Sequence, residues 1–268
     1  MIKRKVEGLE VLSCSSKDKK ANATPLLFVH GSFSGAWVWD EHFLPYFAAQ
    51  GYDAHALSLR GHGDSFGHEH LDAHSVHDYV DDLATVIGDL GTAPVLIGHS
   101  MGGFVVQKYL ERHAVPAAVL MCSVPPQGLV AAQFSMMFQK PGLMIELNRL
   151  LGGEDVSLDI LREALFAQDI PVATLERYYR KMQQESQRAI WDMSMFNLPA
   201  IDRMHRPPLL VLGAEQDHLM PAFLVQTTAQ TYGVPSRIFR GLGHGVMLEK
   251  DWLQVAEAVR DWLLEQPL

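Results

Sequence analysis

The stretch that decides the fold is Val95-Leu96-Ile97-Gly98-His99-Ser100-Met101-Gly102-Gly103. Its apolar beginning is typical of a buried strand, and residues 104–110 favour a helix. A strand, a sharp turn and a helix would place one serine hydroxyl at the apex, at a helix N-terminus. We expect Ser100 to have a positive φ, which a non-glycine residue adopts only when its surroundings force it. Gly98 and Gly102 stand where a Cβ would collide across the turn.

The composition of the 268-residue chain suits one large domain, or one domain with an insertion. Its hydrophobic fraction of 48% is ordinary, and its formal net charge of -9 gives no electrostatic support for a nucleic-acid partner. Two cysteines, Cys14 and Cys122, have neither disulfide-framework nor metal-ligand spacing. No apolar run approaches the roughly 18 residues of a membrane span, and no signal-peptide core begins the chain. We therefore expect a cytoplasmic protein without a membrane span.

Apolar runs alternate with helix-like segments along the first part of the chain. One or two edge strands and a polar turn over 15–23 come first. The runs that predict buried strands are then 26–29, 52–59, 94–97 and 117–121, and the helix-like segments are 37–50, a stretch ending at Leu90, and one from Ser100 to about His113. This alternation predicts an α/β fold with a doubly wound, mostly parallel sheet.

The alternation stops between 125 and 206, where no convincing strand is found. Five helix-like segments occupy this stretch: 129–139, 143–151, 158–168, 172–184 and 186–195. Strand patterns resume at 208–213 and 236–240, followed by a final amphipathic helix over 251–264. The sequence therefore predicts a core made of 1–124 and 207–268, with a helical cap inserted over 125–206.

The chemistry of a serine nucleophile requires a base that takes its proton and a carboxylate that orients the base. His244 lies between glycines in the loop after the last predicted strand, and we predict that it is the general base. Glu215 and Asp217 share the loop after the preceding strand, so spacing alone leaves the acid open between them. The backbone N–H of Met101, at the predicted helix N-terminus, would donate to the developing oxyanion.

Several motifs together resemble the α/β-hydrolase superfamily, and in particular its small lysophospholipase-like or carboxylesterase-like serine hydrolases. They are Gly-His-Ser-Met-Gly-Gly, His30-Gly31 followed by Gly35-Ala36-Trp37, Arg60-Gly61-His62-Gly63-Asp64-Ser65, Gly213-Ala214-Glu215-Gln216-Asp217 and Gly243-His244. The resemblance covers nearly the whole chain except the cap. It implies the α/β-hydrolase fold and catalysis without a cofactor.

The same resemblance implies roles for individual residues. The acid would be Asp217, which matches the aspartate that this family carries in the turn after the penultimate strand. Some relatives place the acid after the strand that follows the helix of the nucleophile, but no carboxylate stands there in this chain. The second oxyanion donor would be the backbone N–H of Ser32, with Phe33 as the fallback.

Five histidines lie between 62 and 77, and they invite a metal interpretation. A solvated polar loop explains them better, because nothing guarantees that they converge, so we predict no metal site. His62 is expected to order its own loop, and His30 to support the oxyanion loop through a hydrogen bond. His99 precedes the nucleophile, and we expect it to point away along the strand.

The cap is rich in methionine and aromatic residues, which suit a deformable apolar pocket over the active site. We predict that Phe33, Trp37, Met137 and Phe138 contact the substrate. The reaction expected is hydrolysis of a carboxylic ester, a small-molecule or acyl-chain substrate, through an acyl-enzyme.

Two alternatives stay open at this point. One is a carbon–carbon or hydroxynitrile lyase that uses the same triad, with Lys140 or Lys181 of the cap reaching the site. The other is a non-catalytic member of the fold that binds a ligand. The sequence indicates neither the physiological substrate nor the oligomeric state.

Overall fold

The computed structural model describes residues 1–16 and 24–268, so most of the polar turn expected over 15–23 lies outside the described residues. One eight-stranded sheet has the order β1-β2-β4-β3-β5-β6-β7-β8. The strands are β1 (Ile2–Val6), β2 (Leu9–Cys14), β3 (Leu26–Val29), β4 (Ala54–Leu57), β5 (Val95–His99), β6 (Ala118–Met121), β7 (Leu209–Ala214) and β8 (Ser236–Phe239). The pairs β1–β2 and β2–β4 are antiparallel and the rest are parallel, which confirms the mostly parallel sheet.

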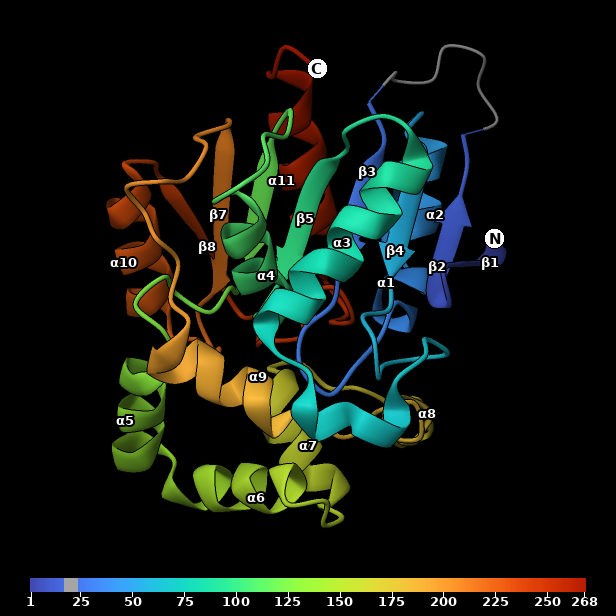
Figure 1. Ribbon diagram of the computed structural model, residues 1–268. Coiled ribbons are helices and arrows are strands. Elements are labelled where there is room, and N and C mark those ends of the chain that lie inside the picture. Colours follow the sequence, from blue (N-terminus) through green and yellow to red (C-terminus); the bar gives the residue numbers. More distant parts are fainter. Residues whose placement is uncertain (17–23) are drawn as a thin grey trace.

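Helices cover both faces of this sheet (Figure 1). One face packs against α1 (Trp37–Asp40), α2 (Phe43–Ala49) and α11 (Trp252–Leu264). The other packs against α3 (Val76–Leu90), α4 (Met101–Tyr109) and α10 (Ala222–Tyr232). Neighbouring residues of one strand therefore enter different cores: Phe28 joins the first and Leu27 the second. Because both faces are buried, the central strands are continuous apolar runs, which is why the sequence revealed them.

The helix expected over 37–50 is two helices, α1 and α2. Between them His42 has a non-helical φ of -131° and ψ of -52°. Pro45 explains the break, because it has no N–H to donate to Glu41 and its ring would clash with that carbonyl in a continuous helix. The short helix η1 (His68–Ala73) precedes α3.

Between β6 and β7, where the structure describes every residue, only helices form. They are α5 (Val130–Gln139), α6 (Pro141–Leu151), α7 (Leu158–Leu165), α8 (Val172–Tyr179) and α9 (Gln187–Trp191), followed by the π-helical turn η2 (Asp192–Phe196). These cap helices, α5 to α9, gather at one end of the sheet (Figure 1). That end carries the loops that follow β3, β5 and β8, so the cap covers the expected catalytic residues.

Two cap helices are shorter than the sequence predicted, because tertiary hydrogen bonds replace helical ones. At the end of α7, Leu165 O accepts the N–H of Gly245 at 2.7 Å instead of continuing the helix. Beyond α8, the N–H of Gln183 donates to Phe33 O at 3.1 Å. Both contacts attach the cap to loops of the core. Among the described residues, no helix is long and apolar enough to cross a membrane.

Candidate active site

Ser100 stands at the sharp turn between β5 and α4, with a φ of 53° and a ψ of -118°. The positive φ expected from the sequence is therefore present. Its N–H donates to Met121 O at 3.0 Å, and its carbonyl accepts the N–H of Val124 at 3.1 Å. These bonds to the neighbouring strand hold a conformation that a serine does not adopt freely.

The glycines around Ser100 allow backbone segments to approach closely. A Cβ on Gly98 would lie 2.5 Å from Gly102 O, and one on Gly102 would lie 2.4 Å from His30 O. Both collisions are with backbone, which confirms why the turn needs glycine at these positions. Gly103 also matters, because its Cβ would lie 2.3 Å from Ser123 Oγ. This role of Gly103 has no local signal in the sequence, because its contact is with the end of another strand.

The structure brings His244 and Asp217 together at a distance of 2.7 Å between Nδ1 and Oδ2. The other carboxylate oxygen of Asp217 accepts the N–H groups of Leu219 and Met220, at 2.8 and 2.7 Å. Because a carboxylate only accepts, Nδ1 of His244 carries the proton and Nε2 is left as the basic nitrogen. The acid that faces the imidazole is thus Asp217. Glu215 is exposed and accepts the N–H of Gly241 at 3.2 Å.

Side chains of His99 and Glu249 hold the main chain around His244 through hydrogen bonds. His99 Nε2 donates to His244 O at 2.9 Å, and their rings lie 4.6 Å apart. The carboxylate of Glu249, fully buried, accepts the N–H of Gly243 at 2.8 Å and that of Ala167 in the cap at 2.6 Å. The expectation that His99 points away from the site is therefore wrong. His99 lines the site and contacts the loop of the predicted base.

Burial and the neighbouring groups set the charge of this cluster. Burial, and then the positive charge that His244 would carry, keep the pKa of His99 well below its ordinary value, so His99 is neutral. Burial raises the pKa of the Cys122 thiol, and the carboxylate of Asp217, to which the thiol hydrogen-bonds, raises it further. Cys122 therefore stays a thiol beneath the acid.

Among the described residues, one group could hold a metal ion: the ligand atoms of His99, Cys122 and His244 lie within 4.8 Å of one another. Both imidazoles already have hydrogen-bond partners there. In the histidine-rich stretch over 62–77, His68 and His74 face the main-chain oxygens of Gly63 and Gly67 instead of each other.

The loop after β3 lies beside the nucleophile. His30 Nδ1 donates to Gly31 O at 2.7 Å, while its Nε2 accepts the N–H of Leu59 at 3.1 Å. The predicted supporting role of His30 is therefore confirmed as a hydrogen bond. Burial, together with the charge that His62 carries, lowers the pKa of His30 to about 3, which agrees with a neutral ring that donates once and accepts once.

The side chains of Ser32 and Met101, the two residues expected to supply the oxyanion donors, are in contact. Ser32 Oγ lies 3.5 Å from Met101 Sδ. Met101 is the first residue of α4, where a backbone N–H has no partner within the helix. Phe33, the fallback donor, has a φ of 62°, an unusual value for a bulky side chain.

A cavity of about 200 Å³ opens over Ser100 and His244, between the core and the cap helices. Ser32, Phe33 and Trp37 line it on the core side. The cap side is mostly apolar and includes Leu129, Ala132, Met136, Met144, Leu147, Val156, Ile160, Leu161, Leu165, Met182 and Met193.

Two of the residues predicted to contact the substrate do not line this cavity. Met137 is 42% exposed and Phe138 is 75% exposed. The reason is the rotation of α5 about its axis. Ala132, Gln133 and Met136 form the face toward the cavity, and Met137 and Phe138 point away from it. The prediction for Met137 and Phe138 was wrong for that reason.

The cap lysines that the lyase alternative requires also lie elsewhere. Lys140 Nζ pairs with Glu163 at 2.8 Å, and Lys181 is exposed with Nζ 5.5 Å from the centre of the Trp37 ring. Neither lysine is among the described residues that line the cavity.

Comparison with known proteins now adds the family. The family model described as "Alpha/beta hydrolase family" matches residues 26–258. The chain belongs to this family. The α/β-hydrolase resemblance seen in the sequence is thereby confirmed, and so is the fold it implied.

Relatives with established names agree with a hydrolase. The chain is 27% identical over 250 residues to a non-heme haloperoxidase of Rhodococcus erythropolis, covering 83% of this chain and 86% of the relative. It is 28% identical over 240 residues to a monoacylglycerol lipase of Mycolicibacterium smegmatis, covering 83% and 82%. These family members support ester hydrolysis in general terms.

Solved structures show the same fold. The esterase EaEST from Exiguobacterium antarcticum superposes with a TM-score of 0.71 at 18% identity, covering 95% of this chain and 94% of that one. A thermophilic esterase from Thermogutta terrifontis gives a TM-score of 0.72 at 19% identity, covering 96% and 94%.

Proposed function

We propose that this α/β hydrolase is a serine hydrolase that cleaves carboxylic esters with Ser100, His244 and Asp217 as a triad. The observation that carries the proposal is the 2.7 Å contact between His244 Nδ1 and Asp217 Oδ2, beside a serine held at a φ of 53° over the same cavity. An oriented imidazole with a free Nε2 is the base that a serine nucleophile requires.

The reaction would run in two steps. The Oγ of Ser100 attacks the ester carbonyl carbon while Nε2 of His244 takes the hydroxyl proton, and the alcohol leaves with that proton. Water then attacks the acyl-enzyme, gives a proton to His244 and releases the acid, which restores Ser100. The N–H groups of Met101 and Ser32 would stabilise the oxyanion of both tetrahedral intermediates.

The cavity supports an apolar acyl or aryl group as the part of the substrate that the cap covers. Its cap side is built mostly of aliphatic and methionine side chains, which adapt to ligand shape. Phe33 and Trp37 line the opposite side and remain the proposed contacts from the core. We also propose that residues 125–206 act as one cap unit over this cavity.

The test is hydrolysis of p-nitrophenyl esters graded by acyl length, with wild type, Ser100→Ala and Asp217→Asn. The matched control is Glu215→Gln, an exposed carboxylate in the same loop. We expect Ser100→Ala to lose at least about 10⁴-fold in kcat, and Asp217→Asn about the same, while the control stays near wild type.

A fluorophosphonate should label wild type at Ser100 alone. Turnover in Ser100→Ala equal to wild type would exclude the proposal, and cleavage of mandelonitrile by wild type without esterase activity would favour the lyase.

A further inference from the structure

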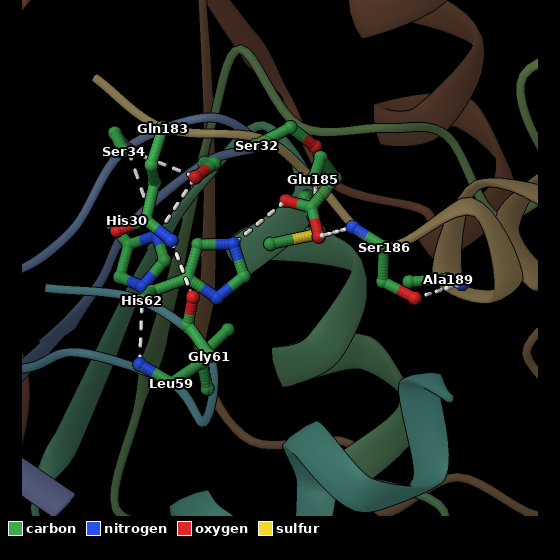
Figure 2. Close-up of polar contacts among 12 residues, drawn as sticks. His30, Ser32, Ser34, Leu59, Gly61, His62, Gln183, Glu185, Ser186 and Ala189 are labelled. Carbon is green, nitrogen blue, oxygen red and sulfur yellow. Dashed lines mark hydrogen bonds and ion pairs between the residues drawn. The ribbon is translucent and has the colours of Figure 1, made fainter. Parts of the chain in front are cut away.

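A buried polar cluster joins the segment between α8 and α9 to the loop after β4 (Figure 2). Glu185 is its centre and is fully buried. One carboxylate oxygen lies 3.2 Å from His62 Nε2, and the other accepts the hydroxyl of Tyr79 at 2.9 Å and the N–H of Ser186 at 2.7 Å. His62 has no exposed surface. A charged cap side chain is thus enclosed within the core and is matched there by a histidine.

The hydrogen bonds of His62 define its charge. Nδ1 lies 3.0 Å from Arg60 O, which only accepts, so this nitrogen carries a proton. Nε2 faces the carboxylate of Glu185 and donates to it, so the ring is an imidazolium paired with a carboxylate. Burial alone would lower the pKa of His62, but the charge and hydrogen bond of Glu185 outweigh it and the pKa is raised. Burial would raise the pKa of Glu185, but His62 lowers it overall.

The same cap segment reaches the oxyanion loop directly. The backbone N–H of Gln183 donates to Phe33 O at 3.1 Å. The side-chain amide of Gln183 donates to Gly61 O and accepts the N–H of Gly63, the latter at 2.8 Å. Gln183 therefore connects the strained residue of the oxyanion loop to the loop that carries His62.

The orientation of Ser32 N–H depends on these contacts. This N–H belongs to the same planar peptide group as Gly31 O, so whatever fixes that oxygen also aims the N–H. Gly31 O accepts from His30 Nδ1 at 2.7 Å and from Ser34 Oγ at 2.8 Å. The ring of His30 lies 5.0 Å from the ring of His62. Ser34 follows Phe33, whose carbonyl accepts the N–H of Gln183. Figure 2 shows the His62 ring between His30 and Glu185.

We propose that Gln183 and Glu185 are positioning residues for the oxyanion hole, which set the direction of Ser32 N–H through Phe33 and through His62. The inference depends on the proposed serine-hydrolase function. If Gln183 and Glu185 act in this way, the cap must lie in its observed position on the core for the transition state to be stabilised. This requirement is separate from the cap's contribution to substrate binding. Neither residue lines the cavity, so neither contacts the substrate in this role.

The experiment compares Glu185→Gln and Gln183→Ala with wild type. Glu185→Gln keeps the size of the side chain and the acceptor for Tyr79 and Ser186, but removes the charge that pairs with His62. Gln183→Ala keeps the backbone N–H that bonds to Phe33, but it removes the amide bridge to Gly61 and Gly63 that holds this N–H in position. The N–H donors of the oxyanion hole act on the transition state and not on the bound substrate. A change in their direction should therefore lower kcat for a p-nitrophenyl ester about ten-fold in each variant, with KM changed less than about two-fold.

Matched controls are available at other cap-to-core contacts. Gln168→Ala removes an amide that bridges to Asp251 at 2.7 and 3.0 Å. Glu41→Gln removes an ion pair with Arg177 at 2.7 Å on the surface. Both controls loosen the attachment of the cap without touching the oxyanion loop, and both should keep wild-type kcat.

A second readout separates positioning from loss of fold. An alkyl trifluoromethyl ketone forms a tetrahedral adduct with the serine, and its affinity should fall in parallel with kcat/KM in the two variants, whereas affinity for the acid product stays within about two-fold. Wild-type kcat in both variants, or an equal loss in the controls, would overturn the proposal. A rise in KM alone would overturn it as well. Wild type that fails to react with a fluorophosphonate would instead reject the proposed function itself.

Discussion

His99 Nε2 lies 2.9 Å from the main-chain oxygen of His244, so the residue before the nucleophile fixes the loop of the proposed base. His99 is buried and neutral, and the pKa of its ring is well below the ordinary value because of burial and then the positive charge that His244 would carry. One hydrogen bond thus links the end of β5, just before the sharp turn at Ser100, to the loop after β8. His99 thus precedes Ser100 in the chain and contacts the main chain of His244.

We expect His99→Phe to lower kcat/KM for p-nitrophenyl esters by about ten-fold, because the lost hydrogen bond releases the backbone that carries His244. The control is His77→Phe, an exposed histidine of α3 that should keep wild-type kinetics. Unchanged kcat/KM in His99→Phe would show that the loop holds its position without this bond.

Gly98→Ala is expected to destabilise the protein by about 3 kcal/mol, because the new Cβ would meet backbone atoms that cannot move aside. Those atoms, in Gly102 and Gly103, lie 2.5 to 2.6 Å from the Cβ position. Urea unfolding measures the change. At Gly88 in α3 a Cβ would meet nothing within 4 Å beyond the local backbone of the helix, so Gly88→Ala should stabilise by about 0.5–1 kcal/mol. The two substitutions should therefore shift the urea midpoint in opposite directions.

The sequence predicted the sheet, the inserted helices and the loops of Ser100 and His244 because each depends on local signals, whereas the choice of Asp217 over Glu215 depended on the family resemblance. A buried strand is an apolar run, and a loop after a strand places its side chains at one known edge of the sheet. The contact of Asp217 with His244 follows from two such loops meeting at that edge.

The supporting residues could not be predicted in the same way. Glu185 pairs with a histidine 123 positions earlier, and Glu249 accepts from a cap residue 82 positions earlier, so no spacing rule connects them. A charged residue in a polar stretch is normally solvated, and only the packed structure shows that Glu185 is enclosed. The placement of Met137 and Phe138 in the pocket failed for the same reason. Which face of α5 points toward the cavity can be predicted only when the position of the cavity is known.

Met136 and Met137 are neighbours on α5, but only Met136 lines the cavity, and the pair offers a test of the proposed pocket. Met136 is 8% exposed and lines the cavity, whereas Met137 is 42% exposed and does not. We expect Met136→Ala to lower kcat/KM for medium-chain p-nitrophenyl esters by about ten-fold relative to the acetate, because contacts with the chain are lost. Met137→Ala should keep the wild-type chain-length profile. The same profile change in both variants would contradict the assigned face of the helix.

The pair between His62 and Glu185 predicts how stability depends on pH. The pKa of His62 is raised from 6.5, so its stabilising effect is full below that value and is lost as pH rises through the raised pKa. The pKa of Glu185 is lowered from 4.5, so its effect is full above that value and is lost as pH falls through the lowered pKa. The pair therefore stabilises the fold between the two shifted pKa values and weakens toward alkaline pH.

We expect Glu185→Gln to reduce the free energy of unfolding by about 3 kcal/mol near neutral pH, because it leaves a buried histidine without its counter-charge. Above the raised pKa of His62, wild type loses the pair as well, and the difference between the two proteins should shrink. Urea unfolding from about pH 6 to pH 10 measures it. Glu41→Gln, which removes a surface ion pair, should show a small difference of about 0.5 kcal/mol that does not follow this titration. A gap between wild type and Glu185→Gln that stays constant across the series would mean that His62 is neutral and that the contact is an ordinary hydrogen bond.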